Sequence, residues 1–344
     1  MNNQKTNLTE EQIFKKAYGT LLGVATGDAL GMPSSMMSPE AIKNTFKKKI
    51  TSFLPAPDGH IIHFGMKAGE ITDDTQQTLV LADIYLEEGK FSKESVAKRL
   101  LAWAKAMDGF TNTLLGPSSI RSLKRIEDGV PIDQAGTMGD TNGAAMRISP
   151  VGIVNPGDYD AVIKDVHEVC IPTHNTNIAI SGAASVACAV AAGMAGEDID
   201  GVIDAYYYGV NKGMALGTQW YSASISHRAK WALEIARSGK SEEEFLSDLY
   251  NYIGAGVVMS EATPTALALF VYYKGDPMKT IMGAANMGGD CDTIGAIAGS
   301  IAGAYAGSDA FPQEIIDKLE EVNKLNLKKY AHEFTGKITA KKME

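Results

Sequence analysis

The chain of 344 residues has only three cysteines, and no two of them are spaced like a metal-binding motif. Cys170, Cys188 and Cys291 also form no disulfide framework, which suits a reducing cytosol, so we expect a cytoplasmic protein. Positive charge is in deficit as well, with a net charge of −9 and a pI of about 5.3. This balance argues against nucleic acid as a partner.

Signals for strands and membrane segments are also scarce. No segment alternates strictly between apolar and polar residues, and clusters of β-branched residues are short. Residues 1–11 are polar and lack the apolar core of a signal peptide. The longest apolar run, residues 178–194, is mostly Ala, Gly and Ser and is slightly short for a bilayer span, which favours a buried helix. We therefore expect no membrane association.

The patterns that do recur are helical and cover most of the chain. With 45% hydrophobic and 21% charged residues, the chain can bury a large core. Apolar spacing predicts helices over residues 13–29, 74–88, 93–107, 198–216, 223–238 and 242–250, among others. We expect an all-α fold in one large multi-helical domain at residues 11–335, with a disordered polar start at 1–10 and a frayed tail at 336–344. We favour a monomer.

Two predicted helices carry glycines at every fourth position. Gly19, Gly23 and Gly27 form one stripe, and a second runs from Gly295 through Gly299 and Gly303 to Gly307. Each glycine costs a helix about 1 kcal/mol relative to alanine. The cost makes sense where another backbone approaches closely, so we expect these two helices to pack tightly around one centre.

Two threonine-led acidic corners stand far apart in the sequence. Asp73 and Asp74 begin one helical pattern, and Asp290 and Asp292 lie on a glycine-hinged turn that begins another. Side-by-side carboxylates are costly unless a cation or a shared proton neutralises them. We hypothesise that both corners meet around two divalent ions, because four carboxylates balance two Mg²⁺ ions and hard cations prefer oxygen ligands.

Several other polar residues could have either a functional or a purely structural role. Asp28 is either a cap-like structural acid or a support for the metal ligands. The loop at residues 108–119, with Gly116 and Ser118, either presents helix-start amides to an anion or sugar, or is an ordinary capped turn. Arg147 suits bidentate pairing with a phosphate, and equally suits tying two helices together. His174, at a helix start, is usually a capping or core residue.

Five segments, taken together, resemble the ADP-ribosylglycohydrolase family, which includes the dinitrogenase-reductase-activating glycohydrolases. They are residues 23–31 (GVATGDALG), 72–75 (TDDT), 142–150 (NGAAMRISP), 173–174 (TH) and 288–307 (GGDCDTIGAIAGSIAGAYAG). The segments occur in the family's order and cover nearly the full length. The chain is most similar to a bacterial subgroup with GDALGMPS and LGPSS-like loops.

The resemblance implies a metal-dependent glycosidase with two Mg²⁺ ions, which Mn²⁺ can replace. By motif, one ion would be held by Thr72, Asp73, Asp74 and Asp292, and the other by Asp290, Asp292 and Thr293. The implied reaction is hydrolysis of a glycosidic bond at C1 of a ribose, in ADP-ribosylated residues or ADP-ribose conjugates. The four aspartates would be the catalytic groups, since two metals can orient ribose hydroxyls and activate a water.

For the substrate, we expect contacts from Asp28, Ser35, Gly116, Ser118, Asn142, Gly143, Met146, Arg147 and His174. One departure from the family matters here. Ser35 stands where family members often carry a glutamate, seven residues past Asp28, and a serine cannot act as that carboxylate. Either the substrate differs, another acid substitutes, or activity is weak. Cys291 replaces a common threonine and should point away from the metals.

Three other functions compete with the leading one. A smaller N-riboside, such as a nucleoside-like metabolite, could be the substrate, and Ser35 motivates this reading. The chain could instead be a non-catalytic relative that binds ADP-ribose. A phosphatase of the haloacid-dehalogenase type is disfavoured, because Ile294 occupies the last position of the DxDx[TV] motif and no buried strand precedes it.

Overall fold

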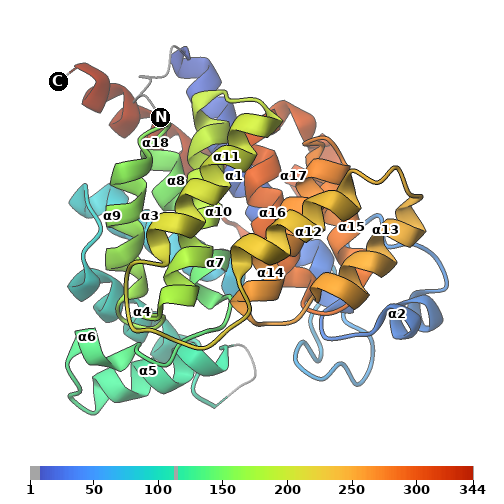
Figure 1. Ribbon diagram of the computed structural model, residues 1–344, viewed down its shortest axis with the longest axis horizontal. Helices are drawn as coiled ribbons and strands as arrows, with labels where there is room; N and C mark the ends of the chain where they lie inside the picture. The colour runs from blue at the N-terminus through green and yellow to red at the C-terminus, as the bar shows by residue number, and fades with distance from the viewer. Residues whose placement is uncertain (1–7, 112–114, 344) are drawn as a thin grey trace.

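The structure is a computed structural model that describes residues 8–111 and 115–343. Within these residues the chain is helical, with three isolated bridges and no sheet, so the predicted all-α fold is confirmed (Figure 1). The predicted disordered start at 1–10 falls mostly on residues 1–7, outside the described part, and α1 begins at Glu10. The residues of the predicted frayed tail, 336–344, fall on the last part of α18, which extends to Met343.

The helices of the first half of the chain are α1 (Glu10–Gly31), η1 (Met32–Ser34), α2 (Pro39–Phe46), α3 (Asp73–Glu88), α4 (Lys93–Ala106), α5 (Pro117–Glu127), α6 (Ile132–Ala135), α7 (Gly143–Met146), α8 (Ser149–Val154) and α9 (Tyr159–Cys170). Those of the second half are α10 (Asn177–Ala195), α11 (Ile199–Gly213), α12 (Ile225–Ala236), α13 (Glu242–Asp248), η2 (Leu249–Ile253), α14 (Met259–Tyr272), α15 (Pro277–Met287), α16 (Cys291–Ala306), η3 (Ser308–Ala310), α17 (Gln313–Asn323) and α18 (Leu327–Met343).

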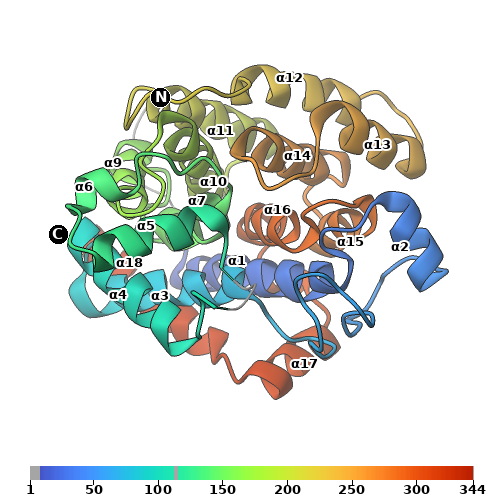
Figure 2. The same cartoon turned by 90° about the horizontal axis from the view of Figure 1, so that it is seen from below.

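Helices α1 and α16 lie side by side at the centre, with α12 and α14 on one side and α17 on the other (Figure 2). Their glycine stripes meet as predicted. A β-carbon on Gly19 would lie 2.5 Å from the carbonyl oxygen of Gly303, and one on Gly23 would overlap the carbonyl oxygen of Gly299. Because the backbones touch, the N-terminus of α16 is held against the C-terminal half of α1.

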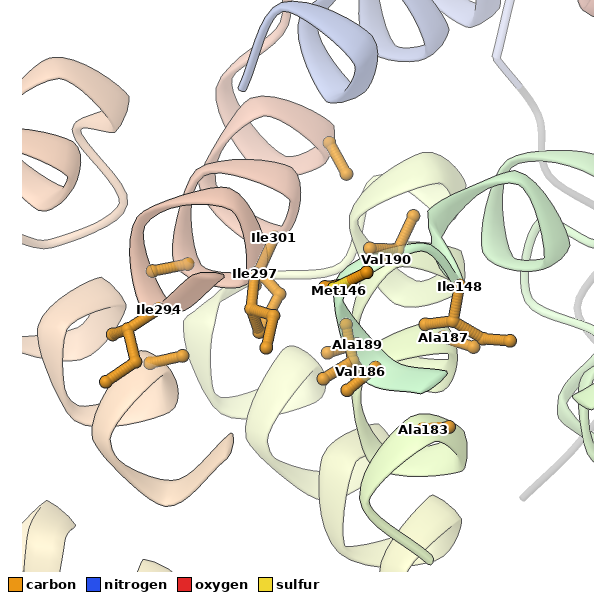
Figure 3. Close-up of a cluster of buried hydrophobic side chains, with 14 of the residues drawn as sticks. Met146, Ile148, Ala183, Val186, Ala187, Ala189, Val190, Ile294, Ile297 and Ile301 are labelled. Carbon is orange, nitrogen blue, oxygen red and sulfur yellow. The ribbon is translucent and has the colours of Figure 1, made fainter. Parts of the chain in front are cut away.

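The apolar helix α10 forms the other half of this core. Val186 and Val190 of α10 face Ile297 of α16, with Met146 between the two helices (Figure 3). By length and composition α10 is the one described helix that could cross a membrane, but 94% of its apolar window is buried inside the molecule. Its apolar length therefore serves packing, as predicted.

Candidate active site

The two acidic corners meet at the N-termini of α3 and α16. Thr72 is the N-cap of α3, and its hydroxyl accepts a hydrogen bond from the backbone N–H of Asp74. Asp290 directly precedes α16. The side chains of Asp73, Asp74, Asp290 and Asp292 line one cavity of about 180 Å³. Residues more than two hundred positions apart in the sequence thus share one site.

A turn made of two glycines sets the second corner. Gly288 and Gly289 both adopt positive φ angles, 94° and 85°. A β-carbon on Gly289 would also overlap the carbonyl oxygen of Ala255, which accepts a 2.7 Å hydrogen bond from the backbone N–H of Asp290. Only glycine fits here, and the close approach fixes where the Asp290 side chain starts.

Asp28 positions the first corner and does not touch the cavity. It is fully buried, and its carboxylate accepts hydrogen bonds from the backbone N–H groups of Thr72 and Thr75 and from the hydroxyl of Thr75 at 2.5 Å. Asp28 thus lies behind the cavity wall, and its predicted contact with substrate stays a prediction. Its role is to hold the N-terminus of α3 against α1.

Asp292 is the most heavily bonded of the cavity carboxylates. Its Oδ1 accepts hydrogen bonds from Ser35 Oγ (2.5 Å) and from the backbone N–H of Thr293 (2.9 Å), and its Oδ2 lies 2.7 Å from His63 Nε2. Burial by itself would raise the pKa of Asp292, but the hydrogen bond and charge of His63 lower it to about 2. Asp292 is thus the carboxylate that stays ionised.

The pKa values of the other three cavity carboxylates are raised, whereas that of Asp292 is lowered. Burial, followed by the charges of Asp28 and Asp292, raises the pKa of Asp73 to about 8. Burial and neighbouring carboxylates also raise the pKa values of Asp74 and Asp290 well above the ordinary range. A cluster that repels its own negative charge in this way attracts a cation.

The residues fit a divalent cation in charge and in donor type. All candidate ligands offer oxygen, and Oδ1 of Asp74 is buried without a hydrogen-bond partner. Their present arrangement does not match a metal site, because within residues 8–111 and 115–343 no three His, Cys, Asp or Glu side chains are grouped so that they could hold an ion. The hydrogen bond that Asp290 Oδ2 accepts from Asn142 Nδ2 (2.5 Å) would have to adjust around an ion.

The predicted site residues divide between the cavity wall and the layer behind it. Those that line the cavity are Asp73, Asp74, Gly116, Asn142, Gly143, Met146, Asp290, Asp292 and Thr293. Those that do not line it are Asp28, Ser35, Thr72, Ser118, Arg147 and His174. Of the second group, Ser35 bonds to Asp292 and Thr72 donates from its hydroxyl to Asp74 Oδ2 at 3.0 Å. Cys291 is buried and also lies away from the cavity, as predicted.

Arg147 and His174, two of the predicted substrate contacts, lie in the layer behind the cavity wall. Arg147 is fully buried and donates to Gln77 Oε1 (2.5 Å) and Thr173 Oγ1 (2.6 Å), so it ties α3 to the segment before α10. His174 is equally buried, with its ring nitrogens near the hydroxyls of Thr141 and Thr173. Burial lowers the pKa of His174 well below its ordinary value, which keeps the ring neutral. Neither side chain lines the cavity, and their predicted contacts with substrate stay predictions.

Sequence reasoning missed His63, which lines the cavity. It lies in the irregular segment between α2 and α3, where no periodic pattern draws attention to a side chain. The pair His60 and His63, three residues apart and just upstream of the first acidic corner, was the signal available. Met36 and Val257 also line the cavity, and no sequence pattern marks either of them.

Comparison with known proteins places the chain among a group of related sequences. The model of the family described as ADP-ribosylglycohydrolase matches residues 9–342. The uncharacterized protein YegU of Escherichia coli (strain K12) is 37% identical over 319 residues, covering 92% of this chain and 95% of that protein. An uncharacterized protein of Archaeoglobus fulgidus is 32% identical over 308 residues, covering 89% and 92%.

Two more distant similarities are to a protein with a named activity and, separately, to a solved structure. The ADP-ribosyl-[dinitrogen reductase] glycohydrolase of Rhodospirillum rubrum is 25% identical over 320 residues, covering 91% of this chain and 93% of that protein. A solved structure titled "ADP-ribosylglycohydrolase-related protein complex" superposes with a TM-score of 0.70 at 22% identity, covering 95% of this chain and 99% of that chain. At 22% identity, the similarity to this structure shows a shared fold and no more.

Proposed function

Because this chain belongs to the ADP-ribosylglycohydrolase family and is therefore a glycosidase, we propose that it hydrolyses the bond at C1 of a ribose in ADP-ribosylated residues, using two Mg²⁺ ions. The observation that carries the proposal is the cavity itself, into which four carboxylates from two distant helix starts point. Mn²⁺ is the expected substitute ion, since it also prefers oxygen ligands. We also propose a cytoplasmic location and a monomer.

Each corner would hold one ion once its side chains adjust around it. Thr72, Asp73, Asp74 and Asp292 would serve one ion, and Asp290, Asp292 and Thr293 the other. When bound, the ions would supply Lewis acidity that orients ribose hydroxyls and activates a water. The net negative charge of the aspartates would in turn stabilise the positive charge that develops on the ribose as the glycosidic bond breaks.

The dimensions of the cavity indicate which part of a substrate it encloses. Its volume of about 180 Å³ is below the roughly 300–1,000 Å³ of pockets that enclose a drug-sized ligand. It therefore suits a ribose, with the rest of a larger ligand outside. Gly116 and Ser119, at the start of α5, line one wall, and the backbone N–H groups there favour a diphosphate at the rim.

An activity assay with matched variants tests this function. The purified chain is incubated with an ADP-ribosylarginine substrate and with a panel of nucleosides, in Mg²⁺ and in a chelator. We expect turnover of the ADP-ribosyl substrate in Mg²⁺ only, and its loss in Asp292→Ala. Asp309→Asn, which alters an exposed carboxylate outside the cavity, should keep full activity. Equal turnover with and without the chelator would contradict the metal dependence.

A small N-riboside is the second candidate substrate, and two observations favour it. The cavity is small, and Ser35 is bonded to Asp292 where the family often has a glutamate. Turnover of nucleosides alone would establish this alternative and overturn the ADP-ribosyl substrate. Tight binding of ADP-ribose without turnover of any substrate would instead identify a non-catalytic relative, a reading that Ser35 also favours.

A further inference from the structure

We propose that His63 is a positioning residue of this site: its Nε2–H holds Asp292 in the orientation that receives a divalent ion. The inference rests on the metal centre of the proposed function and assigns a residue to it that no sequence motif indicates. It also gives a role to the irregular segment between α2 and α3, which is otherwise only a connection.

The contact between the two side chains is short and shielded from solvent. His63 Nε2 lies 2.7 Å from Asp292 Oδ2, and each side chain is only 5% exposed. Both residues line the same cavity. A hydrogen bond to a charged group in such surroundings is stronger than one in water, so it fixes the rotation of the carboxylate.

The division of donors between the two carboxylate oxygens indicates which oxygen can take an ion. Oδ1 of Asp292 already accepts from Ser35 Oγ and from the backbone N–H of Thr293. Oδ2 accepts from His63 Nε2. Since a carboxylate oxygen offers about two lone pairs, the hydrogen bond from His63 occupies one lone pair of Oδ2 and determines where the other points.

The turn that carries His63 is built to present this nitrogen. His60 Nδ1 accepts hydrogen bonds from the backbone N–H groups of Ile62 (3.3 Å) and His63 (3.0 Å), which closes the turn. The two imidazole rings stack with centroids 5.2 Å apart. His63 Nδ1 is buried without a hydrogen-bond partner, so it lacks the acceptor that usually orients a metal-ligating histidine. We therefore assign the proton to Nε2 and make His63 a donor to Asp292, not a ligand.

Calorimetric titration with Mn²⁺ and with Mg²⁺ tests this role without a substrate. Loss of an orienting partner of this kind typically weakens metal binding by about 10–100-fold. We expect that loss in His63→Leu, which removes the donor. His63→Gln, which restores an N–H donor, should stay within a few-fold of the wild type. His227→Gln is the matched control, because His227 is exposed and its ring bonds to the N-cap serine of α12, away from the cavity.

The outcomes separate this inference from the proposed function. If the wild-type chain binds neither ion, the metal centre itself is wrong. If it binds and His63→Leu binds equally well, the metal centre stands and the role of His63 is wrong. If His63→Gln loses as much affinity as His63→Leu, a donated hydrogen bond is not what matters, and the inference is overturned. Thermal melting of each variant shows whether it is folded, and His63→Gln serves the test if the leucine variant is not.

Discussion

At the scale of single residues, the site depends on side chains that never touch its cavity. Arg147 is the clearest case, since its guanidinium is fully buried between Gln77 and Thr173. Burial lowers the pKa of Arg147 to about 10, although the charge of Asp73 favours the protonated form. The arginine therefore remains cationic at neutral pH and holds α3 beside the segment that precedes α10.

Replacing Arg147 by methionine should lower stability without discriminating between ligands. Gln77 and Thr173 each lose a donor inside the core, and we expect the free energy of unfolding to fall by about 2–4 kcal/mol. KM values for a diphosphate-containing substrate and for a bare riboside should change by the same factor. Denaturant melts and steady-state kinetics measure the two effects. The control is Arg237→Met, whose exposed ion pair with Asp200 contributes at most about 1 kcal/mol. A selective loss for the diphosphate substrate would restore Arg147 as a ligand contact.

At the scale of elements, the pairing of α1 with α16 decides where both acidic corners stand. The pairing brings the end of α1, which carries Asp28, to the start of α16, which carries Asp292. A β-carbon on Gly27 would overlap the carbonyl oxygen of Gly295, one turn beyond Asp292. Asp28 in turn holds the start of α3, so a single helix–helix contact sets the relative positions of both corners.

Alanine substitutions along this contact should be unequal in effect. In Gly23→Ala the new methyl group meets the backbone of Gly299, which cannot move aside as a side chain could. We expect a loss of about 3 kcal/mol in unfolding free energy. Gly336→Ala is the matched control in α18, because nothing lies within 4 Å of its β-carbon position. That variant should gain up to about 1 kcal/mol from helix propensity. Equal melting temperatures for both variants would mean that α1 and α16 do not pack closely.

At the scale of the whole molecule, the acid cluster links folding to pH and to metal. Burial raises the pKa values of Asp28 to about 6 and Asp73 to about 8, so the folded state holds protons that the unfolded chain has released. Whenever the folded state binds more protons, stability falls as pH rises. The lowered pKa of Asp292 opposes this effect only below about pH 4, where its unfolded form takes up a proton.

The metal-free chain should therefore lose stability between about pH 5 and about pH 8. In a chelator, we expect its melting temperature to fall across this range. Saturating Mg²⁺ should raise the melting temperature, and most strongly at the alkaline end, because the ion binds the deprotonated cluster and only in the folded state. Differential scanning calorimetry in parallel pH series measures both slopes. A flat or rising profile in the chelator would show that the four aspartates are not crowded.

Most helices could be predicted from the sequence, because apolar spacing and capping residues are patterns within a short segment of chain. Apolar spacing indicated the helices, Thr72 marked where α3 begins, and the glycine pair marked the turn before α16, which begins at Cys291 and not at Thr293. Helix ends differ from those predicted: α1 spans Glu10–Gly31 and not 13–29, α11 ends at Gly213 and not 216, and α18 continues to Met343. Helix ends depend on caps and packing partners from elsewhere in the chain, which periodicity does not contain.

The sequence by itself determined which helices form, that two glycine-striped helices can touch, and which residue types can bind a cation. Only the tertiary structure decided which side chains face the cavity. Arg147 and His174 belong to motifs beside the cavity residues but point into the core, whereas His63 comes from a segment without any pattern and reaches Asp292. Local spacing specifies the backbone of an element, while the direction in which a polar side chain finds its partner depends on elements that are distant in the sequence.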